Sequence, residues 1–165
     1  MEALFPGLVT ATDWHPLFVH FPIAFWSGAF LFALLGAVRA SDRLVETGRW
    51  LLYLGVAGAI PAAATGWWAM TRVGEDPIHD RVHVHQYFML AATGLAIAAA
   101  ITGFALRRRA DARARWVLAA MLGATVAVTT LGADRGAELV YRYGVGTRPE
   151  MPTTRSPPAH GDHDH

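Results

Sequence analysis

The sequence predicts an all-α membrane protein, a bundle of four transmembrane helices with no separate soluble domain. Of the 165 residues, 53% are hydrophobic and only 16% are charged, which is less charge than a soluble domain usually carries. The apolar residues gather in four blocks without charged side chains, each about as long as a helix that crosses about 30 Å of hydrocarbon. Lipid offers the backbone no hydrogen bonds, and the blocks lack the alternation of barrel strands, so helices are expected. The predicted spans are residues 17–38, 51–70, 87–106 and 116–133.

The third of these helices has a recognisable start before its apolar block. Asp76-Pro77 is typical of an N-cap followed by proline at the first helical position. A helix that begins there extends beyond the apolar block and places His79 and His83 on one face, because they are four residues apart. His85 then points about 160° away from His83.

The region after the fourth span has a mixed composition. Residues 134–146 are too polar to cross a membrane and too apolar to form a free tail. We expect them to fold back over the outer mouth of the bundle as an interfacial segment. The remaining residues are rich in Pro, Thr and Ser and end in alternating His and Asp, a composition typical of disorder. We therefore predict a four-span domain with its interfacial segment at 1–147 and a disordered His/Asp-rich tail at 148–165.

Arginine residues decide the predicted orientation in the membrane. The first and third connections between spans carry eight of them, whereas the segment before the first span has none. Positively charged loops stay in the cytoplasm. We therefore predict a multi-pass protein of the bacterial inner (plasma) membrane, with both termini and all eight histidines outside the cytoplasm. Tryptophans should form an aromatic belt, with Trp14, Trp26, Trp67 and Trp68 near the outer boundary and Trp50 and Trp116 near the inner one.

Histidines near the start of the first and third spans indicate a b-type haem between these two helices. Two neutral imidazoles on facing helices are the usual axial ligands in membrane cytochromes, and they need no cysteine, which this chain lacks. The candidate axial pair combines His20 with His83 or His85. Haem propionates prefer guanidinium partners, and three arginines lie on the predicted outer side. The candidate cofactor-binding residues are His15, His20, His83, His85, Arg81, Arg135 and Arg142.

A haem at this face would carry single electrons, between a quinol and a periplasmic redox partner. Two alternatives stay open. A Zn²⁺ or Cu²⁺ ion could bind His79 and His83, whose spacing places two ligands on one helix face. The chain could also be a cofactor-free structural or accessory subunit of a homo- or hetero-oligomer. The tail histidines that could add to metal binding are His160, His163 and His165.

Other function classes find no support in the sequence. The three serines have no convincing base beside them, which argues against a hydrolase or a transferase with a serine nucleophile. No glycine-rich phosphate loop is present. The arginine clusters flank spans and are explained by topology, so nucleic-acid binding is not expected. The bilayer is the one partner that the composition predicts directly.

The two ends of the predicted domain resemble a known bacterial membrane family. His15-Pro16 and the run Val19-His20-Phe21-Pro22-Ile23-Ala24 open the first span, and Gly136, Leu139-Val140-Tyr141 and Gly144-Val145-Gly146 follow the last one. This pattern is similar to the family called domain of unknown function 2231. The resemblance implies four spans and a histidine near the start of the third, but no activity. Ala137 departs from the family pattern, which usually has a second glycine there.

Overall fold

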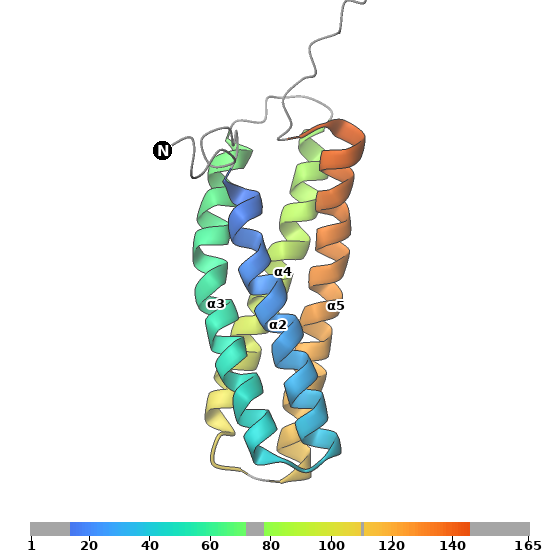
Figure 1. Ribbon diagram of the computed structural model, residues 1–165. Helices are drawn as coiled ribbons and strands as arrows, with labels where there is room; N and C mark the ends of the chain where they lie inside the picture. Colours follow the sequence, from blue (N-terminus) through green and yellow to red (C-terminus); the bar gives the residue numbers. More distant parts are fainter. Residues whose placement is uncertain (1–13, 72–77, 110, 146–165) are drawn as a thin grey trace, which may run out of the picture.

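Four long helices form a single bundle in the computed structural model, which describes residues 14–71, 78–109 and 111–145 (Figure 1). The described residues contain no strand, and each helix is long and apolar enough to cross a membrane. The predicted fold class is therefore confirmed. The helices are α2 (His15–Val38), α3 (Asp42–Met70), α4 (His79–Ala105) and α5 (Ala112–Tyr143).

The helices run alternately up and down, so that α2 begins and α5 ends at the same end of the bundle (Figure 1). We call this end the histidine end, because α2 and α4 begin there with His15 and His79. The opposite end carries the short connections from α2 to α3 and from α4 to α5, and we call it the loop end. The assignment of the histidine end to the outside of the cell stays a prediction.

The helices extend beyond the apolar blocks, and one expectation about their ends was wrong. Residues 134–143 do not fold back over the bundle, because α5 continues without a break to Tyr143. The extension stays helical because one side of it packs on α4, with Leu139 only 6% exposed. Gly144 then ends the helix in the left-handed conformation that favours glycine, with φ 68°. The proposed helix start at Asp76-Pro77 and the tail 148–165 lie outside the described residues.

Small residues allow the helices to approach closely. Gly48 of α3 lies against the backbone of Ala29 in α2, where an added Cβ would be 3.0 Å from the carbonyl oxygen. Gly55 lies against the indole of Trp26, a residue that is only 1% exposed. Trp26 is therefore a core residue, and its assignment to the aromatic belt was wrong. The other five belt tryptophans are exposed, as expected: Trp14, Trp50, Trp67, Trp68 and Trp116.

Candidate ligand site at the histidine end

His85 is fixed in the contact between α4 and α5. Its Nδ1 lies 2.7 Å from the carbonyl oxygen of Gly132, and its ring covers Gly136, where an added Cβ would be 2.9 Å from Cε1. A carbonyl oxygen can only accept, so Nδ1 carries the hydrogen and Nε2 carries the lone pair of a neutral ring. An imidazole that donates from one nitrogen to a backbone carbonyl and offers the other is the usual form of a metal-ligating histidine.

His15 makes the same kind of contact between α2 and α3. Its Nδ1 lies 3.0 Å from the carbonyl oxygen of Ala62 and 3.4 Å from the hydroxyl of Thr65. Its ring covers Gly66, where an added Cβ would be 2.8 Å from Cε1. The carbonyl contact again places the hydrogen on Nδ1.

Both rings continue the buried faces of their helices. His15 precedes the buried Pro22 by seven residues, and His85 precedes the buried Ala92 by the same number. Seven residues are almost two full turns, so each histidine lies on the face that its helix turns towards the core. Both rings are half-buried.

The other two candidate axial ligands point elsewhere. His20 is exposed, and its Nδ1 donates to the carbonyl oxygen of Pro16 in its own helix at 2.6 Å. His83 precedes His85 by two residues, so it points about 160° away from the contact with α5. There its Nε2 lies 2.9 Å from Nε2 of His79. The structure thus distinguishes His83 from His85, which the sequence alone did not.

Three arginines converge one turn beyond His85. Glu138 accepts ion pairs from Arg81 at 3.4 Å, Arg142 at 3.3 Å and Arg135 at 3.7 Å. Arg81 precedes His85 by four residues and lies on the same face of α4. Three guanidinium groups around one carboxylate leave a local charge of about +2, which favours an anionic ligand.

A cleft of about 200 Å³ opens beside this cluster. Its lining combines two apolar side chains of α4 with charged groups from both helices: Arg81, Val84, Phe88, Arg135 and Glu138. The cleft therefore joins an apolar wall to a cationic rim, and His85 is not among its lining residues. The three arginines that the sequence predicts as propionate partners lie together here, and their binding of an anion stays a prediction.

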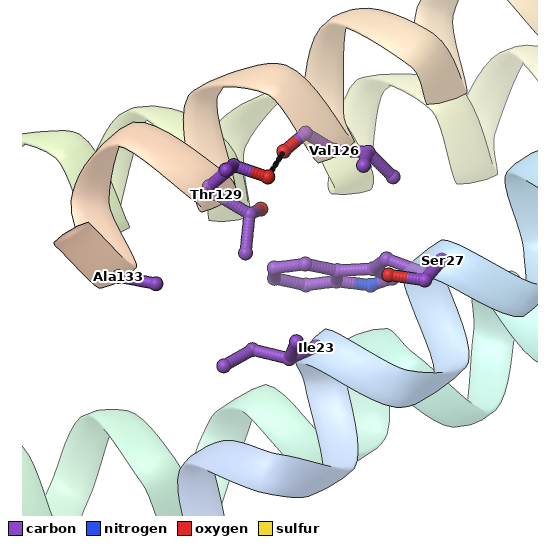
Figure 2. Close-up of a pocket in the computed structure, with 7 residues that line it drawn as sticks. Ile23, Ser27, Val126, Thr129 and Ala133 are labelled. Atoms are coloured by element: carbon purple, nitrogen blue, oxygen red, sulfur yellow. Dashed lines mark hydrogen bonds between the residues drawn. The ribbon is translucent and has the colours of Figure 1, made fainter.

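A second cleft, of about 110 Å³, lies deeper between α2 and α5 (Figure 2). Thr129 and Thr130 line it, but both hydroxyls already donate to backbone carbonyls of α5, Thr129 to Thr125 at 2.7 Å and Thr130 to Val126 at 2.9 Å. Trp26 lines the cleft with its ring, and its buried Nε1 has no hydrogen-bond partner among the described residues. Nothing in the sequence pointed to this cleft, because its lining residues are ordinary components of membrane helices.

The two α4 histidines of the metal hypothesis lie side by side on one face of the helix. The rings of His79 and His83 meet edge to face, with centroids 4.5 Å apart, and metal binding there stays a prediction. Within the described ranges, no group of three or more His, Cys, Asp or Glu residues could hold a metal ion. The site therefore offers two ligands rather than a complete set. His160, His163 and His165 lie outside the described residues.

Together these features define an integral membrane protein with four spans and a histidine- and arginine-lined end. The chain belongs to the family described as Predicted membrane protein (DUF2231), whose model matches residues 12–149. The resemblance of the opening and closing motifs is thereby confirmed. No curated protein and no solved structure matches the chain. The family description supports a membrane protein and names no activity.

Proposed function

We propose that the histidine end binds a b-type haem and transfers single electrons at the outer face of a bacterial inner membrane. The observation that carries the proposal is the His85 ring, which faces the core with Nδ1 bonded to the Gly132 carbonyl at 2.7 Å. This bond fixes the ring orientation and keeps Nε2 as the basic nitrogen. Of the histidines on α4, His85 is thus the better suited to be an axial ligand.

The residues around His85 fit such a group. Arg81 and Arg135 provide cationic groups for the propionates, and Val84 and Phe88 provide apolar surface in the adjacent cleft. Haem itself supplies one-electron redox chemistry when it is bound. The protein would orient the ligand imidazole, neutralise the propionates and limit access of water. A quinol and a periplasmic redox protein are the electron partners that suit this position.

A reduced-minus-oxidised absorption spectrum of the protein in mild detergent, without added haem, tests the proposal. We expect the sharp bands of a low-spin bis-histidine haem. His85→Ala should abolish them, whereas the matched control His83→Ala, on the opposite side of the same helix, should retain them. A flat spectrum of the unmodified protein would refute haem binding.

A second candidate function rests on a different observation, the close approach of His79 and His83. Two imidazoles that share a tetrahedral Zn²⁺ have ligand nitrogens about 3.3 Å apart, which follows from Zn–N distances of about 2.0 Å. The Nε2 atoms here are 2.9 Å apart, so a small rotation of the rings would bring them to that distance. Elemental analysis for zinc and copper separates the candidates. His79→Ala should remove the metal and His85→Ala should not, whereas a cofactor-free subunit would contain neither metal nor haem.

A further inference from the structure

The four helices are related in pairs by a constant shift of 70 residues. Four of the five buried residues of α2 correspond, after this shift, to all the buried residues of α4. The shift matches Pro22, Trp26, Ala29 and Ala33 to Ala92, Ala96, Ala99 and Gly103.

The same shift relates α3 to α5. Six of the seven buried residues of α3 correspond to buried residues of α5. The N-caps of the two helices, Ser41 and Asp111, also correspond, and both have extended backbones. Two unrelated helices could share the spacing of their buried residues simply because both are helical. That would not explain why their N-cap residues also correspond. The matched pairs are Gly48–Leu118, Arg49–Ala119, Leu52–Leu122, Gly55–Thr125, Ala59–Thr129 and Ala62–Gly132.

The histidine contacts repeat with the same spacing. His15 reaches a carbonyl 47 residues further along the chain, at Ala62, and His85 also reaches a carbonyl 47 residues further along, at Gly132. Each ring covers the glycine four residues beyond that carbonyl. We infer that the chain consists of two copies of one helical hairpin, and that His15 and His85 are equivalent residues that form the pair of axial ligands.

The equivalence selects His15 over His20 as the ligand from α2. Both hairpins start at the histidine end, so the axis that relates them runs along the bundle, as in membrane proteins built from parallel repeats. With such an axis, equivalent residues of the two hairpins lie at the same depth. His20 lies five residues beyond His15, about 7.5 Å deeper than His85. An iron that is bound on both faces needs two imidazoles at similar depth, and His15 meets this condition. This step rests on the proposed haem.

The two hairpins differ in the arginines at the histidine end, and this difference would orient a bound ligand. The residues of α3 that correspond to Arg135 and Glu138 are Thr65 and Trp68. Among the described residues, the ion pair of Arg135 with Glu138 therefore has no counterpart in the first hairpin, whereas the residue that corresponds to Arg142 is Arg72, which lies outside the described ranges. A ligand with its carboxylates on one edge would bind in one orientation, with that edge towards α4 and α5.

Four single variants of the full chain test the ligand pair. We expect His15→Ala and His85→Ala each to lose the bis-histidine spectrum and to regain a six-coordinate spectrum with added imidazole, which shows that the variant has folded. The matched controls His20→Ala and His83→Ala should keep the spectrum. Loss of the spectrum in His20→Ala with retention in His15→Ala would overturn the ligand pair and leave haem binding intact.

A second readout does not depend on haem. Nitrogen-15 spectra of labelled histidines in the cofactor-free protein should show Nδ1-protonated rings for His15, His85 and His20, since the Nδ1 of each contacts a backbone carbonyl oxygen. His15→Ala and His85→Ala should each remove one of these signals, and His20→Ala identifies the third. The signals of His15 and His85 in a protein with a flat visible spectrum would refute haem but support the equivalence of the two rings. A His15 or His85 ring protonated at Nε2 would refute the equivalence directly.

Discussion

Replacing Gly136 by alanine should displace the His85 ring and destabilise the bundle measurably. The added Cβ would lie 2.9 Å from Cε1 and 3.2 Å from Nδ1, whereas ordinary contact begins at 3.4 Å. The ring must therefore move by about half an ångström, which strains a close-packed contact and stretches the 2.7 Å bond to Gly132. Overpacking costs about 1–3 kcal/mol and a weakened hydrogen bond about 0.5–1.5 kcal/mol.

The alanine also stabilises the helix itself, by up to about 1 kcal/mol, and a control must remove this term. Gly94 of α4 supplies the control, because an added Cβ would meet nothing within 4 Å. The free energy of unfolding in detergent should therefore be about 1.5–4.5 kcal/mol lower for Gly136→Ala than for Gly94→Ala. Equal stabilities of the two variants would refute the close contact between His85 and α5.

Three further substitutions have defined outcomes. Trp26→Phe removes a buried Nε1–H that has no partner among the described residues, so the free energy of unfolding should change by less than about 1 kcal/mol. Trp26→Ala should lower it by about 3–5 kcal/mol. Arg49→Met keeps most of a buried side chain that pairs with the half-exposed Glu46, so the unfolding temperature should resemble that of the wild type. If it fell as far as that of Arg49→Ala, the charge would be needed for stability. Glu138→Gln should change stability by less than about 1 kcal/mol, because the arginines around it are about half exposed or more, yet increase binding of inorganic phosphate in a titration. Unchanged phosphate binding would argue against an anion site.

The sequence predicted the number and order of the helices because hydrophobic length alone decides them in a membrane. It did not predict where the helices end. The last turns of α5 bury side chains such as Leu139, which is 6% exposed. The average composition of this stretch is polar, so the sequence alone suggested a segment outside the bundle. Nor could it separate His83 from His85, because the choice depends on the helix phase. That phase is fixed by Gly132 and Gly136, which lie on another helix about 50 residues away.

The repeat is hidden in the sequence because equivalent positions of the two hairpins hold residues of different size. Trp26 of the first hairpin lies on Gly55, whereas the equivalent positions of the second hairpin hold Ala96 and Thr125. The first hairpin thus packs a very large side chain against a glycine, whereas the second has a small and a medium-sized side chain at the equivalent positions. Trp26 also lines the cleft towards α5, so it fills space that both hairpins share. A second tryptophan at position 96, where Ala96 is fully buried, would overpack the same core, so the two hairpins need residues of different size at this position.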